Sequence, residues 1–253
     1  MKIAVCVKQV PTREWQPRLT DDKTWIRESD ASFELNEPDA YALEEGLRLK
    51  ERHGGEVVVC AAGPARVAQV IREALARGAD RAIHVEAETL SAADAFGVAD
   101  VLADAMREEA FDLVLTGLQS DDQGHAQVGV VLAERLGIPH ATIIMDVQVE
   151  DGRLRVKREL EGGWFQWIAL PLPALLTIQS GINQLRYATL KGIMAAKKKE
   201  IRKVVPSGAI AARQRIAALY LPERKKQTEM LTGTAVEAAS ELVRRLRDEA
   251  RAL

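Results

Sequence analysis

The chain has 253 residues, 47% of them hydrophobic and 4% aromatic, which suits one large soluble domain, or one domain with an appendage, and a mainly aliphatic core. Its net charge is −2, but residues 191–253 carry 15 Lys and Arg against 7 Asp and Glu, whereas the rest carries 20 against 30. No apolar run approaches the roughly 20 residues that cross a bilayer, and the N-terminus lacks the pattern of a signal peptide. We therefore expect a protein that is not membrane-embedded, located in the cytoplasm, or in the mitochondrial matrix if eukaryotic.

Strand-like apolar runs alternate with stretches of helical periodicity over the first 137 residues. The predicted strands are residues 3–7, 56–61, 82–85 and 111–115. The predicted helices are residues 36–50, 65–77, a helix that begins at a Ser91/Asp94 capping box and ends near residue 110, and 127–136. The strands are nearly continuous hydrophobic runs, as expected when helices cover both faces of a sheet. We predict an α/β fold, a doubly wound, mostly parallel sheet with helices on both faces.

The pattern changes after Gly137. Residues 142–150 and 154–160 flank an Asp151-Gly152 turn and predict a β-hairpin addition, which is followed by further strand over 164–178. Beyond residue 196 we expect a C-terminal extension ending in an amphipathic helix that Thr234 and Glu237 cap. The predicted domains are therefore 1–195, which binds a nucleotide, and 196–253, an arm whose helix packs on the body or on another protein.

Four segments of the predicted sheet converge where an open parallel sheet binds its ligands, beyond the carboxyl ends of its strands. They are residues 7–11, 35–39, 62–64 and 116–129. The last reads TGLQSDDQGHAQVG, in which glycines allow close approach of an anion and polar side chains can bind a ribose or base. The alternative is that Ser120, Asp121 and Asp122 only cap the next helix.

Signatures of catalysis are missing from the sequence. There is no G-x-G-x-x-G after the first strand, no G-x-x-x-x-G-K-[ST] and no G-x-S-x-G. No cysteines or histidines have the spacing of metal ligands, so no metal site is expected, and Cys6 and Cys60 are expected to be buried and reduced. Nucleic acid is also not expected, because one run of three lysines in an acidic chain is weak support for it. The residues indicate binding, without catalysis.

Four motifs, in this order, resemble the β subunit of electron-transfer flavoproteins. They are IAVCVKQVP from residue 3, TGLQSDDQGHAQVG from 116, VKRELEGG from 156 and GINQLRYATLKGIMAAKKK from 181. The resemblance implies a heterodimer whose α subunit holds most of a redox-active FAD. Electrons would pass from an acyl-CoA-type dehydrogenase to this FAD and on to a quinone-linked membrane oxidoreductase. The chain would then be a subunit of a carrier and not an enzyme.

The resemblance also implies a structural AMP in the β subunit, with its phosphate at the N-terminus of the helix after residue 126. Its contacts would be Cys6, Asn36, Glu37, Pro38, Asp39, Ala62, Gly117, Leu118, Gln119, Ser120, Asp121, Asp122, Gln123, Gly124, His125, Ala126, Gln127 and Val128. These residues belong to, or adjoin, the four segments at the ligand-binding edge.

The segment Arg186-Tyr187-Ala188-Thr189-Leu190 resembles the family's recognition loop for the dehydrogenase, in which Leu190 would enter a pocket of the partner. The C-terminal arm would clasp the α subunit. Leu185 stands where the family commonly has proline, and the loop at 122–127 matches neither the AMP-binding nor the bifurcating pattern. An electron-bifurcating complex, with a second FAD in place of AMP and NADH as donor, therefore remains an alternative, as does a free-standing nucleotide-binding module.

Overall fold

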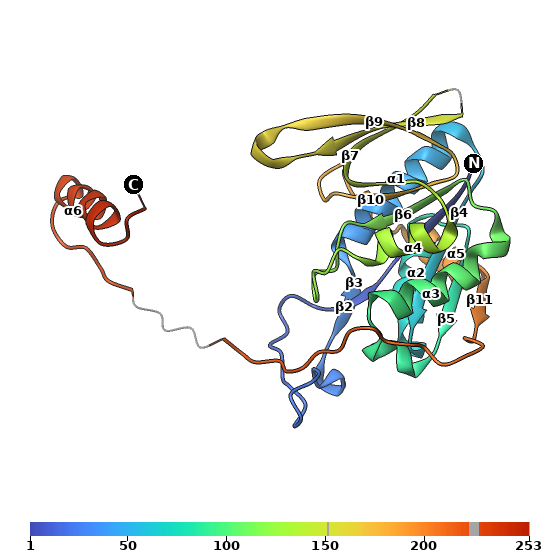
Figure 1. The fold of residues 1–253 in the computed structure, drawn as a ribbon, viewed down its shortest axis with the longest axis horizontal. Helices are drawn as coiled ribbons and strands as arrows, with labels where there is room; N and C mark the ends of the chain where they lie inside the picture. Colours follow the sequence, from blue (N-terminus) through green and yellow to red (C-terminus); the bar gives the residue numbers. More distant parts are fainter. Residues whose placement is uncertain (151, 223–227, 253) are drawn as a thin grey trace. The chain divides into compact units, whose positions relative to one another are not determined.

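The computed structural model describes residues 1–150, 152–222 and 228–252, which form two compact units, Met1–Leu219 and Tyr220–Leu253. The first unit contains a nine-stranded sheet in the order β11-β5-β4-β1-β6-β10-β7-β8-β9 (Figure 1). Its strands are β1 (Lys2–Cys6), β4 (Glu56–Gly63), β5 (Arg81–Glu86), β6 (Leu113–Gly117), β7 (His140–Glu150), β8 (Arg153–Glu159), β9 (Phe165–Pro171), β10 (Ala174–Ile178) and β11 (Ile201–Val204). All neighbours from β11 to β7 pair in parallel, and only β7–β8 and β8–β9 are antiparallel.

Both faces of the parallel sheet are buried, and the alternation of side chains along each strand shows it. In β1, Ile3 and Val5 belong to one hydrophobic cluster, whereas Ala4 and Cys6 belong to another on the opposite face. Ile3, Ala4 and Val5 are all 0% exposed. This is why the strands read as continuous apolar runs.

Five helices supply the two covering layers of the first unit as far as the structure describes it. α1 (Glu37–His53), α2 (Ala68–Arg77) and α5 (Leu190–Ala196) contribute residues such as Leu43, Ile71 and Ala196 to the first cluster. α3 (Ala95–Met106) and α4 (Val128–Leu136) contribute Leu102 and Leu132 to the second. The predicted doubly wound α/β fold is confirmed.

Short elements complete the unit. β2 (Gln9–Pro11) and β3 (Phe33–Leu35) form a separate antiparallel pair. The single helical turns are η1 (Glu28–Asp30), η2 (Ala65–Val67), η3 (Glu88–Ala92), η4 (Arg107–Glu109) and η5 (Glu161–Gly163).

The predicted hairpin is confirmed as β7–β8, and Gly152 has the positive φ of 73° that such a turn requires. Asp151 of the predicted turn lies outside the described residues. The further strand predicted over 164–178 is confirmed as two strands, β9 and β10, which lie at different places in the sheet. Pro173, between them, has no N–H to donate to a ladder.

Two predicted helix caps are wrong. Ser91 lies in η3, and the N-cap of α3 is Asp94, whose extended backbone (ψ 176°) lets its carboxylate accept from Gly97 N at 2.8 Å. Asn36 precedes α1, but its side chain makes no capping hydrogen bond. Its amide instead bonds the backbone of the loop after β6.

The second unit contains α6 (Ala235–Asp248), where the predicted capping box is confirmed: Thr234 and Glu237 bond to each other's backbone. None of the residues of α6 is buried, and Val236 is 76% exposed. The predicted domain boundary at 195/196 differs from the limit of the first unit at Leu219, because β11 pairs with β5 inside the main sheet. In the described parts of the chain, no helix has the length and apolarity needed to cross a membrane.

Candidate nucleotide-binding site

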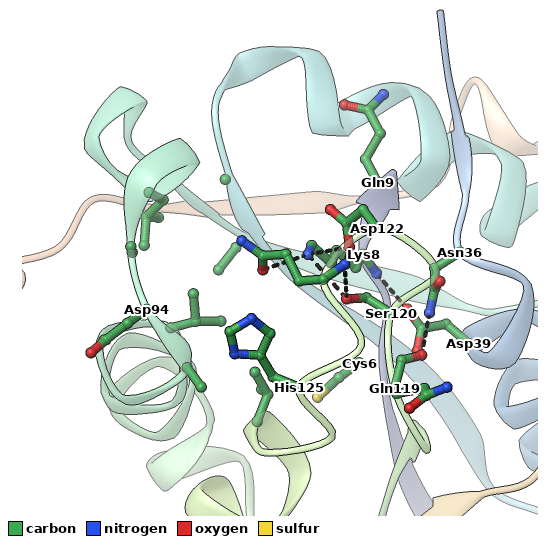
Figure 2. A pocket seen from close by; sticks show the side chains of 18 of the residues that line it. Cys6, Lys8, Gln9, Asn36, Asp39, Asp94, Gln119, Ser120, Asp122 and His125 are labelled. Atoms are coloured by element: carbon green, nitrogen blue, oxygen red, sulfur yellow. Dashed lines mark hydrogen bonds and ion pairs between the residues drawn. The ribbon is translucent and has the colours of Figure 1, made fainter. Parts of the chain in front are cut away.

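A cavity of about 280 Å³ lies beyond the carboxyl ends of β1, β4 and β6. All four segments expected at this edge of the sheet contribute to its walls. The predicted ligand residues that line it are Cys6, Asn36, Asp39, Ala62, Gly117, Leu118, Gln119, Ser120, Asp122, Gln123, His125, Ala126, Gln127 and Val128. Glu37, Pro38, Asp121 and Gly124 are not among its lining residues. Figure 2 shows Asp94 and His125 on one side of the cavity and Asn36, Asp39 and Gln119 on the other.

Asp39 forms the floor of this site. Its carboxylate, in a residue only 7% exposed, accepts hydrogen bonds from Lys8 N at 2.8 Å and from Gly117 N at 2.9 Å. It thereby joins the end of β1, the first turn of α1 and the end of β6. Burial raises the pKa of Asp39 to about 7, although the bonds from Lys8 and Gly117 act in the opposite direction.

Gly117 has no room for a side chain. A Cβ there would lie 2.5 Å from Asp39 Oδ1 and 2.7 Å from the carbonyl carbon of Pro38. Pro38 and Gly117 are therefore packed backbone to backbone under the cavity. Pro38 supports the floor without lining the cavity itself.

Asn36 holds the loop after β6. Its Nδ2 donates to Gln119 O at 3.1 Å, and its Oδ1 accepts from Asp121 N at 2.9 Å. The residue is 1% exposed, so these two bonds satisfy an amide that has little access to water. This use of the side chain explains why Asn36 does not cap α1.

Lys8, which lies in the first motif but was not among the expected ligand contacts, ties the same loop to β1. Its Nζ lies 2.7 Å from Asp122 Oδ1, 3.3 Å from Ser120 Oγ and 3.1 Å from Gln123 Oε1 (Figure 2). Asp121 instead faces Arg13, at 3.2 Å, and Glu37 pairs with the same arginine. The alternative that Ser120, Asp121 and Asp122 cap the following helix is therefore wrong.

The N-terminus of α4 is left open toward the cavity. Gln127 occupies the N-cap position, and no side chain among the described residues caps the helix. Gln127 Oε1 is buried and likewise has no hydrogen-bond partner in the described part of the chain. Free N–H groups at a helix start attract an anion, and a buried acceptor without a donor calls for a ligand N–H or O–H. A nucleotide supplies both kinds of group.

The remaining wall contains residues that sequence reasoning missed. Trp25, Phe33 and Arg66 line it, with the Arg66 guanidinium 4.0 Å above the Phe33 ring and 2.9 Å from Glu28. Asp94 and residues 214–216 also line it. The segments 214–216 and 25–33 carry no motif, and they reach the cavity only through the tertiary fold.

The cavity shows no constellation for catalysis. Cys6 lines it, but burial raises the pKa of its thiol well above the ordinary value, so that the sulfur stays protonated and is a poor nucleophile. Among the described residues, no group of three or more His, Cys, Asp or Glu could hold a metal ion. The arrangement suits the binding of a ligand and not its chemical conversion.

The predicted docking residues lie away from the cavity lining, around the start of α5. Tyr187 and Leu190 are 90% and 78% exposed. Arg186 is not free in the same way: its Nε lies 2.7 Å from Glu44 Oε2, and its Nη1 lies 2.6 Å from Glu51 Oε1. Arg186 thus fixes the segment to α1, whereas Tyr187 and Leu190 of the same segment are exposed to solvent.

Comparison of the sequence with known proteins finds one family. Residues 24–208 match the family described as the electron transfer flavoprotein domain. The chain is 38% identical to the electron transfer flavoprotein subunit beta of Methylophilus methylotrophus, over 96% of this chain and 97% of that one. It is 32% identical to the subunit of the same name from Bacillus subtilis, over 100% of both chains. It is also 35% identical to the caffeyl-CoA reductase-Etf complex subunit CarD of Acetobacterium woodii, over 98% of this chain and 99% of that one.

A family match across most of the chain, with relatives above 30% identity over nearly their whole length, settles the resemblance that the four motifs suggested. The chain therefore belongs to the electron transfer flavoprotein family, as a β subunit.

Proposed function

We propose that this β subunit forms a heterodimer with an α subunit, accepts electrons from acyl-CoA-type dehydrogenases on a shared FAD, and passes them to a quinone-linked membrane oxidoreductase. The family is one of electron carriers, and a β subunit implies an α partner. The FAD supplies the redox chemistry when it is bound. This chain's own residues enclose a nucleotide and present a docking segment. We propose that it works in the cytoplasm, or in the mitochondrial matrix if the chain is eukaryotic; a rice relative is named as mitochondrial.

The cavity residues suit AMP as the nucleotide. The observation that carries this proposal is the buried, unpartnered Oε1 of Gln127 beside the uncapped start of α4. The open N–H groups of Val128 and Gly129 would receive the phosphate, and Gln127 would accept from the ribose or base.

Volume favours a mononucleotide over a dinucleotide. The cavity measures about 280 Å³, just below the roughly 300–1,000 Å³ typical of ligand sites. FAD contains all the groups of AMP and an isoalloxazine, a ribityl chain and a second phosphate besides. These additional groups would have to extend beyond the cavity or displace its walls.

A second candidate is an electron-bifurcating complex with a second FAD in the cavity and NADH as donor. The relative from Acetobacterium woodii, named as part of a caffeyl-CoA reductase-Etf complex, favours it. The cavity volume opposes it.

One measurement separates the candidates. The chain is co-expressed with its α subunit, the purified complex is denatured, and the released nucleotides are quantified. One FAD and one AMP per heterodimer supports the carrier. Two FAD and no AMP supports bifurcation. A stable monomer carrying ATP refutes both.

A further inference from the structure

The segment after β11, residues 205–219, crosses the first unit as an extended chain, which we call the strap. Figure 1 shows it in orange, leaving β11 and running past α3 toward the loop between β2 and β3. Residues 214–216 of the strap line the cavity. The strap forms no helix or strand, so that its position depends on contacts with the rest of the unit.

Asp94 makes the central contact with the strap. Its Oδ2 accepts hydrogen bonds from the backbone N–H groups of Arg213, at 2.6 Å, and Gln214, at 2.8 Å. Its Oδ1 caps α3 through Gly97 N at 2.8 Å. Burial would raise the pKa of Asp94, but the bonds from Gly97, Arg213 and Gln214 outweigh it and lower that pKa. One carboxylate thus joins the start of α3 to the strap at the edge of the cavity.

Contacts on both sides of Asp94 keep the strap in place. A Cβ on Gly97 would lie 2.6 Å from Ile210 Cγ2, so Ile210 packs directly on the first turn of α3. The Arg213 guanidinium lies 4.9 Å from the centre of the Phe96 ring. Farther along, Leu219 N donates to Lys23 O at 2.7 Å, in the loop that also brings Trp25 to the cavity.

The walls of the cavity therefore differ in how they are held. The floor and the loop after β6 are tied to sheet strands and helix starts through buried Asp39 and Asn36. The wall made by the strap is held by exposed backbone bonds and a few side-chain contacts. Segments of this second kind open at a lower free energy than the core.

We propose that the strap retains the mononucleotide in the cavity and that Asp94 is the positioning residue that holds it closed. This inference rests on the nucleotide proposed above. The nucleotide leaves when the Asp94 bonds to Arg213 and Gln214 open.

The test is Asp94→Asn in the full-length chain, purified with its α subunit. Asparagine keeps one oxygen to cap α3 but replaces the second acceptor with an N–H₂ group, which cannot accept from the strap. Loss of charge-assisted bonds predicts AMP release at least about tenfold faster than in the wild type. AMP retained after rapid gel filtration is measured against time. Trypsin cleavage after Arg213 and Arg215 is followed in parallel and should accelerate by a similar factor.

Asp104→Asn is the matched control, because Asp104 lies on the same helix with its side chain 76% exposed and changes charge by the same amount. It should behave as wild type in both assays. Ile210→Ala alters the strap and leaves α3 intact, and it should accelerate both AMP release and trypsin cleavage. It tests the proposal even if Asp94→Asn fails to fold.

The outcomes separate the two proposals. If the wild-type complex holds AMP, and Asp94→Asn and Ile210→Ala both release it at the wild-type rate, the strap proposal is refuted. The nucleotide proposal is then unaffected. Faster cleavage without faster release also refutes it, because the strap would then open without freeing the nucleotide. A wild-type complex that contains no AMP refutes the nucleotide proposal and the inference that rests on it.

Discussion

Replacing Glu44 by glutamine tests whether the docking segment is held from within the subunit. Glu44, with a side chain only 5% exposed, accepts from Arg186 Nε at 2.7 Å, Nη2 at 3.1 Å and the backbone N at 3.2 Å. Glutamine has nearly the same shape but removes the charge and one acceptor. Glu51 still pairs with Arg186, so the loss should be smaller than the 3–5 kcal/mol of a fully broken buried pair, at about 2–3 kcal/mol.

For a unit of this size, such a loss lowers the melting temperature by roughly 4–12 °C. Thermal unfolding of the heterodimer measures it, and the rate of electron transfer from the dehydrogenase should fall because Tyr187 and Leu190 lose their fixed support. Glu51→Gln is the matched control: it faces the same arginine, but its side chain is 57% exposed, and it should cost less than about 1 kcal/mol.

The pH dependence gives an independent check. Burial would raise the pKa of Glu44, but the hydrogen bonds from Arg186 and Arg48 outweigh it and lower that pKa. The stabilisation is therefore present above the ordinary carboxyl pKa and is lost as the pH falls through the lower folded-state value. The difference between wild type and Glu44→Gln should shrink in acid. Equal melting temperatures for Glu44→Gln and Glu51→Gln at pH 7 would refute the reasoning.

Three further substitutions test the site and the docking surface. Leu190→Ala removes an apolar side chain that contributes about 1.5–3 kcal/mol when fully buried. Electron transfer from the dehydrogenase should fall at least about tenfold with FAD content unchanged. Unaltered electron transfer would show that Leu190 does not dock. Asp39 has a folded-state pKa of about 7, so the free energy of unfolding of the wild type should fall by up to about 4 kcal/mol as the pH rises from about 4 to 7. Denaturant unfolding of Asp39→Asn should show no such dependence on pH. Gly117→Ala should lose the nucleotide and more than about 2 kcal/mol of stability. A Cβ on Gly208 would have nothing within 4 Å, so Gly208→Ala is the control and should change neither. Equal unfolding of the two variants would contradict the close packing at Gly117.

The sheet was predictable because its strands are buried on both faces, which leaves a continuous apolar signal in the sequence. Local patterns were less reliable where a polar side chain had two possible partners. Asn36 has the residue type of a helix cap, yet its amide bonds the loop after β6. Ser91 likewise precedes α3 at a plausible spacing, but Asp94 is the cap.

The cavity was only partly predictable for a different reason. Motif residues such as Gln127 lie in the loop that the sequence marked. Lys8 lies in a segment expected at this edge, but its bonds to the loop after β6 depend on the tertiary fold. Residues 214–216 reach the same cavity from a distant part of the chain, and nothing in their own sequence indicates this. Arg186 was expected to face a partner, but its pairing with Glu44 depends on how α1 packs, which periodicity does not specify.

The junction at Asp39 also bears on the order in which the molecule assembles. Its two hydrogen bonds span 31 and 78 residues of sequence, to Lys8 and Gly117. Such long-range contacts close large loops and form only when the intervening strands and helices have found their places. The floor of the cavity therefore exists only where β1, α1 and β6 have come together. A nucleotide that requires this floor would therefore bind only chains in which β1, α1 and β6 are already in contact.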